Sequence, residues 1–443
     1  MTRFFKTETL VFLSLSVRPG VFAPICLGCV LMAGVLSSAA AAPPDAMQAN
    51  PGSTQASPGA GQVGEPSAAS SGAASPPLTR SEVTAIIANS RRVVSPRGIE
   101  ELIPVEINGI PQYLSIRGKD LRNPILLFIH GGPASPEMPL AYTFQTPWED
   151  YFTVVQWDQR GSGKTYAASD PARIADTLTI AQMSSDAVEV VRYLRTRFHK
   201  KKIFAMGHSW GTVLGAAVAR EHPEWLYAYI GVGQVVNVRR SEEIGFEFAL
   251  NSAKADHNDQ AVKDLESLAP YPGAGAVTLE HVALQRKWLE YYGGLTWNRR
   301  NFDYASHAWT LSPDYSEAEL DAIGKGGVLT LNQLLPALSH YDIENEVNFR
   351  CPVVIFDGRH DYSVSHEVSA EWFARVHAPY KKLVWFEDSA HMMFQEQPGR
   401  FLEHLLIDVR PFAARAGDAA PEEEVVTAGE AKTARSGSSG KRF

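Results

Sequence analysis

Short, continuous apolar segments alternate with helical patterns along the central part of the chain. Residues 125–130 (ILLFIH), 152–158 (FTVVQWD) and 203–209 (IFAMGHS) are nearly uninterrupted apolar runs. Runs of this kind are typical of strands that are covered on both faces. Between the last two runs, apolar residues recur at spacings of three and four over residues 183–198, which predicts an amphipathic helix. The alternation therefore predicts a mostly parallel α/β sheet with helices on its faces.

The pattern begins with a hairpin and resumes late in the chain. Residues 104–118 are predicted to form two antiparallel strands around the turn Asn108-Gly109. The later predicted elements are a helix from 211 that ends before Pro223, strands at 226–233, 352–358 and 382–387, and helices near 367–376 and 398–409.

One long interruption and two unpatterned segments define the expected domain organisation. Residues 234–345 are helix-rich and aromatic, and we interpret them as a cap inserted over the edge of the sheet. The core would then consist of residues 78–233 and 346–412, a size close to the upper limit for one hydrophobic core. Residues 43–77 are rich in Pro, Ser, Gly and Ala, and residues 413–443 lack apolar periodicity. We expect a disordered linker and a disordered tail there, because neither can bury enough apolar surface.

The first segment of the chain has the features of a targeting sequence. Residues 1–42 contain basic side chains, then an uncharged apolar stretch at 21–36, then small residues. This order predicts a secretory signal peptide, cleaved after Ala40 or Ala41. An uncleaved membrane anchor is the alternative. Both interpretations place the folded part outside the cytoplasm, in the periplasm or secreted.

Charge and cysteine content exclude several classes of protein. The chain has 41 Lys and Arg against 49 Asp and Glu, a formal net charge of −8, which argues against a nucleic-acid-binding protein. Of the three cysteines, Cys26 and Cys29 lie in the leader, so Cys351 has no partner for an internal disulfide. No cluster of His, Asp and Glu has the spacing of metal ligands, and we expect neither a metal nor another cofactor. The oligomeric state is not indicated.

A serine lies at the junction of a predicted strand and a predicted helix. The segment from Gly207 through Ser209 to Gly211 has the form G-x-S-x-G, in the strand-turn-helix context that this motif requires. A strand that reverses into a helix so abruptly strains the serine backbone, and only glycines allow the neighbouring chain to pass so closely. The arrangement lifts Ser209 clear of the sheet as a nucleophile. The Trp210 amide at the helix N-terminus would then face the reacting oxygen.

A serine nucleophile needs a base and a carboxylate that orients the base. In this architecture the three residues follow in the order serine, acid, histidine. His391 comes directly after the predicted strand at 382–387, in a loop that can reach Ser209. Asp361 follows the strand before it by a short loop and is the favoured acid. Asp357 is the alternative, but it ends that strand itself.

The reaction also needs a second donor for the developing oxyanion. The loop after residues 125–130 begins with Gly131 and Gly132, whose backbone can turn an N–H toward the same pocket. We expect Trp210 and Gly132 to form the oxyanion hole, with Gly131 as the second choice for the loop donor.

A neighbouring glycine-rich segment resembles a phosphate-binding loop only superficially. Gly163, Lys164 and Thr165 match the end of that motif, but Asp158 occupies the position of its first glycine. We expect Asp158 to pair with Arg160 and to support the oxyanion loop.

Five segments together resemble the prolyl aminopeptidase (proline iminopeptidase) branch of the α/β-hydrolase family. They are HGGP (130–133), WDQRGSGKT (157–165), GHSWGT (207–212), GRHDYSV (358–364) and SAHM (389–392). The resemblance covers roughly residues 95–410 and implies the α/β-hydrolase fold, with an eight-stranded, mostly parallel sheet and an inserted helical cap. It also implies that Ser209, Asp361 and His391 form the catalytic triad of an enzyme that removes an N-terminal residue, often proline, from short peptides. One departure is Ala134, where the family has glycine.

The resemblance further implies cap glutamates that hold the free amine of the substrate. Glu290, Glu243 and Glu242 are the candidates in this chain, and Trp288 is a candidate for the substrate-facing wall among the cap aromatics. The expected partner is a short peptide or another small molecule. A carboxylesterase or lactonase acting on a small apolar acyl group is the alternative, since aromatic cap residues would suit it equally.

Overall fold

An eight-stranded sheet organises the computed structural model, which describes residues 77–274 and 277–421. The spatial order of the strands is β1-β2-β4-β3-β5-β6-β7-β8. The strands are β1 (Ile99–Ile107), β2 (Ile110–Gly118), β3 (Ile125–Ile129), β4 (Thr153–Asp158), β5 (Ile203–His208), β6 (Leu226–Val232), β7 (Val353–Gly358) and β8 (Lys381–Phe386). From β4 to β8 every neighbouring pair is parallel, and β1 and β2 add an antiparallel edge. The predicted α/β-hydrolase fold is confirmed, and so is the hairpin, in which both Asn108 and Gly109 have positive φ.

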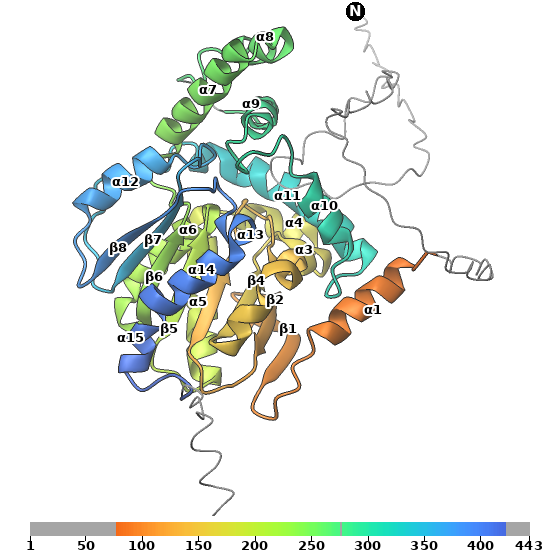
Figure 1. Ribbon diagram of the computed structural model, residues 1–443, viewed down its shortest axis with the longest axis vertical. Coiled ribbons are helices and arrows are strands. Elements are labelled where there is room, and N and C mark those ends of the chain that lie inside the picture. The colour runs from red at the N-terminus through yellow and green to blue at the C-terminus, as the bar shows by residue number, and fades with distance from the viewer. Residues whose placement is uncertain (1–76, 275–276, 422–443) are drawn as a thin grey trace, which may run out of the picture.

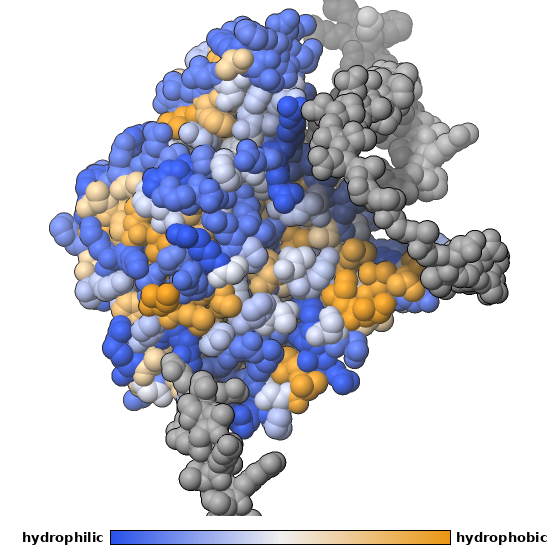
Figure 2. All heavy atoms as spheres, in the orientation of Figure 1, coloured by the Kyte–Doolittle hydropathy of each residue, from blue (hydrophilic) through white to orange (hydrophobic). Residues whose placement is uncertain are grey.

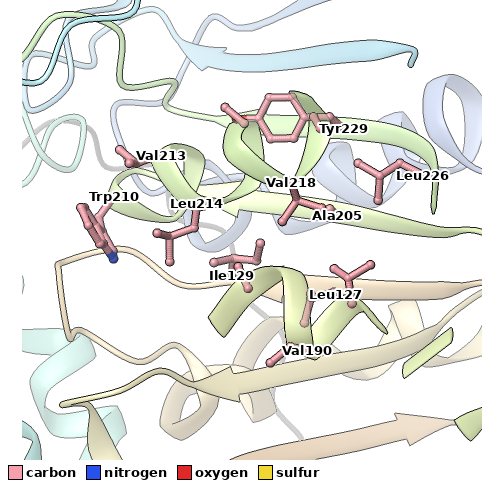
Figure 3. Packing of buried hydrophobic residues seen from close by; sticks show 14 of the residues in the cluster. Leu127, Ile129, Val190, Ala205, Trp210, Val213, Leu214, Val218, Leu226 and Tyr229 are labelled. Atoms are coloured by element: carbon pink, nitrogen blue, oxygen red, sulfur yellow. The ribbon is translucent and has the colours of Figure 1, made fainter. Parts of the chain in front are cut away.

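The central strands are buried on both faces, which explains their continuous apolar runs. In β3, Ile125, Leu127 and Ile129 belong to one hydrophobic cluster, whereas Leu126 and Phe128 belong to the other. Helices α5 (Ile180–Arg197), α6 (Trp210–Glu221) and α12 (His366–Arg375) contribute to the first cluster, whose packing is shown in Figure 3. Helices α13 (Met393–Glu396), α14 (Pro398–His404) and α15 (Pro411–Arg415) cover the second face, in front of the sheet in Figure 1.

Helix α5 illustrates how the apolar spacing produces this layer. Thr179 caps it by accepting a hydrogen bond from the Gln182 amide. Its buried side chains include Met183, Val190 and Leu194, which share the face that packs against the sheet.

Between β6 and β7 the chain forms a layer of helices above the carboxyl ends of the strands (Figure 1). These helices are α7 (Val238–Ala255), α8 (Asp259–Glu266), α9 (Leu279–Tyr291), α10 (Asp303–Thr310) and α11 (Glu317–Leu338). α7, α8 and α9 share a small core of their own that includes Phe246, Leu265 and Trp288. The far end of this cap, around α8, is mostly hydrophilic on the face shown in Figure 2.

The remaining helices of the core lie before β1 or in the loops between strands. They are α1 (Arg80–Ser90), α2 (Ala141–Phe144), α3 (Gly163–Ala167) and α4 (Pro171–Ile174), with 3₁₀ turns at Met138–Leu140, Thr146–Asp150, Ala175–Thr177 and Pro223–Trp225 and a π turn at Leu405–Val409. Helix α1 is joined to the cap, because Arg80 donates hydrogen bonds to the carbonyl oxygens of Thr310 and Tyr315. Within the described residues, no helix is both long and apolar enough to span a membrane.

Two expectations about the core are wrong: where its folded part ends and which residue Asp158 pairs with. The folded part does not stop at residue 412, because Ala413 is buried and Asp418 pairs with Lys200 and accepts a hydrogen bond from Tyr227. The remaining tail from residue 422, the leader at 1–42 and all but the last residue of the 43–77 linker lie outside the described residues.

The second wrong expectation is the pairing of Asp158 with Arg160. Arg160 pairs instead with Asp186 of α5, at 2.8 Å. Asp158 accepts hydrogen bonds from the Lys164 amide and from the Tyr315 hydroxyl of the cap. The segment 157–165 thus connects the core to the cap and to α5, through residues that are distant from it in the sequence.

Candidate active site

Ser209 occupies a strained turn between β5 and α6. Its φ of 53° and ψ of −124° lie outside the regions that most residues adopt, and its amide donates to the Val232 carbonyl at 2.9 Å. A Cβ on Gly211 would lie 2.0 Å from the Ile129 carbonyl oxygen, and one on Gly207 would lie 2.3 Å from the Gly211 carbonyl oxygen. Both glycines are therefore required by close backbone approach.

His391 and Asp361 meet through a short hydrogen bond. His391 Nδ1 lies 2.7 Å from Asp361 Oδ2, and both side chains are buried. The second carboxylate oxygen of Asp361 accepts hydrogen bonds from the amides of Ser363 and Val364 at 3.0 and 2.9 Å. The backbone amide of His391 donates to the Leu295 carbonyl of the cap, so the cap helps to hold this loop.

The two loop glycines and the start of α6 meet at one cavity. Gly131, Gly132 and Trp210 line it together with Ser209 and His391. The structure thus brings together all the residues that the sequence nominated for the triad and the oxyanion hole.

A side chain that the sequence analysis missed connects these segments. Gln159 donates from Nε2 to the His130 carbonyl at 2.8 Å and accepts from the Trp210 indole at 3.0 Å. It therefore ties the glycine loop after β3 to the first residue of α6. Its position in the segment 157–165 was the available signal, but that segment was assigned to Asp158 and Arg160 instead.

Glu396 supports the histidine loop in a similar way. Its carboxylate accepts hydrogen bonds from the amides of Ala390, at 3.0 Å, and of Trp297, at 2.6 Å. Desolvation by burial raises the pKa of Glu396 to about 7.

The cavity itself is about 140 Å³ in volume and lies between the sheet and the cap. Its apolar walls include Val235, Leu295 and Phe302. The two carboxylates among its lining residues are Glu137, from the loop after Gly132, and Glu242, from α7.

Three of the four residues proposed from the sequence as substrate contacts, Glu243, Trp288 and Glu290, do not line this cavity. Glu243 is exposed on the outer side of α7. Trp288 packs in the cap core and donates to Asp264 at 3.0 Å. Glu290 is buried behind the lining residue Phe302, whose amide donates to it, and burial raises the pKa of Glu290 to about 7. These three predictions are wrong. Helical spacing shows which side of a cap helix is polar, but it does not show whether that side faces the cavity.

Glu242 does line the cavity, but it already has strong partners. Arg286, also in the lining, makes a bidentate ion pair with it, and Tyr271 donates to it at 2.6 Å. Among the residues that the structure describes, no group of three or more His, Cys, Asp or Glu side chains could hold a metal ion.

Comparison with known proteins defines the class. The fold, with a serine in a strained turn between a strand and a helix, is that of an α/β-hydrolase. The crystal structure of the proline iminopeptidase of Mycobacterium smegmatis superposes with a TM-score of 0.52 at 16% identity, covering 71% of this chain and 100% of that one.

The family is also defined. Residues 140–398 match the model of the serine aminopeptidase family S33, and the chain belongs to that family, on its prolyl aminopeptidase-like branch. It is 30% identical over 306 residues to a probable aminopeptidase of Bacillus subtilis (YbaC), covering 68% of this chain and 93% of that protein. It is also 22% identical to a proline iminopeptidase of Heyndrickxia coagulans, covering 62% and 87%. The protein is therefore a hydrolase.

Proposed function

We propose that the protein is an aminopeptidase that releases the N-terminal residue, of the proline type, from short peptides or amides. The observation that carries this proposal is the hydrogen bond between His391 and Asp361 beside Ser209, in a chain of the serine aminopeptidase family. The names of its relatives support the peptidase assignment.

The mechanism follows from the positions of these side chains. The Ser209 hydroxyl attacks the carbonyl carbon while His391 accepts its proton, and Asp361 keeps the imidazole in the required tautomer. The backbone amides of Trp210 and Gly132 stabilise the oxyanion, with Gly131 as the alternative loop donor. His391 then protonates the leaving amine, and water hydrolyses the acyl-enzyme. This chemistry uses no cofactor.

The test compares amide with ester substrates. We expect the wild-type protein to cleave proline and alanine arylamides, and Ser209→Ala to cleave neither. A covalent serine-directed probe should label the wild type and spare the Ser209→Ala variant. Ester hydrolysis without arylamide cleavage would overturn the aminopeptidase proposal, and absence of labelling would overturn the assignment of Ser209.

One observation favours a second candidate function. Val235, Leu295 and Phe302 give the cavity apolar walls, which suit the acyl group of a small carboxylic ester or lactone. The same comparison of substrates separates this esterase or lactonase from the peptidase.

We also propose that the protein is exported. The basic and apolar pattern of residues 1–42 supports this. Mass spectrometry of the mature protein should find Ala41 or Ala42 at the N-terminus in a fraction outside the cytoplasm. An intact Met1 terminus in the membrane fraction would indicate an anchor, and an intact cytoplasmic chain would refute export.

A further inference from the structure

Glu137 is a buried carboxylate beside the nucleophile that the mechanism above does not use. It lies in the loop that follows Gly132, and it lines the same cavity as Ser209. It stands directly before the 3₁₀ turn Met138–Leu140, but its side chain makes no capping hydrogen bond to that turn. Its carboxylate is therefore not needed to complete the local backbone structure.

The contacts that Glu137 makes with the described residues are to neutral groups. Gln395 donates to its Oε2 at 3.3 Å, and Tyr304 donates to the Gln395 carbonyl oxygen, which turns the amide nitrogen toward Glu137. Its Oε1 lies 3.8 Å from His208 Nδ1. Burial lowers the pKa of His208 well below its usual value, so this imidazole is neutral. Within the described residues, no Lys or Arg forms an ion pair with Glu137.

Two other carboxylates at the site, Glu242 and Asp361, have close partners. Arg286 pairs with Glu242, and Asp361 is bonded to His391 and to two backbone amides. Desolvation by burial raises the pKa of Glu137 to about 8, which reflects the missing counter-charge. A cation placed in the cavity would favour the ionised carboxylate and form a charge-assisted hydrogen bond with it.

The position of Glu137 relative to Ser209 also suits one kind of cation, the ammonium group of an N-terminal residue. His208 directly precedes Ser209, and a Cβ on Gly131 would lie 3.1 Å from both His208 Nδ1 and Ser209 Cβ. Glu137 Oε1 is 3.8 Å from this same His208 nitrogen, and Glu137, His208 and Ser209 all line the cavity. In an N-terminal residue the ammonium nitrogen is attached to the carbon next to the carbonyl group, so it lies close to the reacting centre.

We propose that Glu137 binds the ammonium group of the substrate's N-terminal residue and so selects substrates with a free amine. This inference rests on the proposed function and assigns the amine site to the core loop rather than to the cap helices. Glu137 thus determines specificity. It takes no part in the proton transfers of the reaction, which His391 carries out.

The test uses the ethyl esters of proline and of cyclopentanecarboxylic acid, which differ in the ring atom that carries the charge. Any serine hydrolase with this cavity can act on esters, so the test does not depend on peptidase activity. We expect the wild type to prefer the proline ester. Glu137→Gln should lower kcat/KM for the proline ester by about 100-fold and change that for the cyclopentane ester by less than about threefold. The matched control is Glu243→Gln, on the exposed side of α7, which should behave as the wild type.

A measurement on the unaltered protein covers the case in which Glu137→Gln does not fold. Prolinol should inhibit hydrolysis of the cyclopentane ester at least about tenfold more strongly than cyclopentylmethanol. Equal inhibition by the two, equal loss of both esters in Glu137→Gln, or an unchanged preference in that variant would overturn the proposal. If proline arylamides are not cleaved but the ester preference depends on Glu137, the peptidase proposal fails and the amine site stands.

Discussion

Asp357 and Asp361 show how two aspartates at one strand–loop junction acquire different environments. Asp357 ends β7, is buried, and has its pKa raised to about 7 by desolvation. Its Oδ2 has no hydrogen-bond partner among the described residues. Asp361 lies in the following loop, where it accepts two backbone amides and the His391 ring nitrogen. Of the two, only Asp361 has a contact with the histidine ring and two backbone donors that fix its carboxylate.

The first prediction separates these two residues. Asp361→Asn should lower kcat by about 10⁴-fold, because an amide cannot stabilise the imidazolium and favours the wrong tautomer. Asp357→Asn should retain most of the activity, since a neutral side chain already suits that site. Steady-state kinetics on the best arylamide or ester would decide, with circular dichroism to verify folding. A larger loss in Asp357→Asn than in Asp361→Asn would exchange their roles.

At the scale of elements, the connection between core and cap depends on a few polar side chains. Asp158 at the end of β4 accepts hydrogen bonds from Tyr315 at the start of the cap helix α11 and from the Lys164 amide. The Lys164 ammonium lies 2.8 Å from Glu319 of α11 and 4.5 Å from the centre of the Tyr315 ring. These contacts hold α11 against α3. Because Leu338 at the end of α11 lines the cavity, they also help to position the cap side of the cavity.

The second prediction tests this connection. Tyr315→Phe should lower the free energy of unfolding by about 1–3 kcal/mol, because the buried Asp158 oxygen loses a donor while the ring packing is kept. Tyr380→Phe, at a side chain that is 41% exposed, is the matched control and should change stability little. Urea denaturation monitored by tryptophan fluorescence provides the comparison. The same midpoint for the two variants would show that the Tyr315 hydroxyl adds nothing.

At the scale of the whole molecule, buried acids should make stability depend on pH. Burial raises the pKa of Asp158, Glu290, Asp357 and Glu396 to about 7 and that of Glu137 to about 8. The folded state therefore keeps protons that the unfolded chain has lost, and the free energy of unfolding falls as pH rises. Burial lowers the pKa of His130 to about 4 and also lowers that of His208, which has the opposite effect below about pH 6.5.

The third prediction follows for the window above the histidine range. The free energy of unfolding should fall between about pH 7 and pH 8, where the buried acids lose their protons and the histidines of the unfolded chain are largely neutral. Urea midpoints measured across that range give the slope. Glu137→Gln should reduce the slope in this window, because Glu137 has the highest burial-raised pKa, about 8, among the acids of the described residues. A stability that rises through this window would contradict the assignment.

Most strands, several helices and the position of Ser209 could be predicted from short segments of the sequence. The strands, the hairpin at Asn108 and Gly109, and helix α5 each depend on a local pattern of apolar or turn residues. Ser209 was identifiable because its two glycines serve a backbone geometry confined to a few residues. The loops that carry Asp361 and His391 could be chosen because each follows a recognisable strand.

The tertiary structure decided what depends on contacts between distant segments. The partner of Arg160 is on α5, that of Asp158 is Tyr315 just before α11, and Asp418 folds back onto Lys200. Likewise, a helical pattern shows that α7 and α9 have a polar side, but not whether that side faces water or the cavity. Cap packing therefore excluded Glu243 and Glu290 and left Glu137 on the core loop facing the site. Local propensity and periodicity determine elements within the chain, whereas the burial and pairing of charged side chains are set only when those elements pack together.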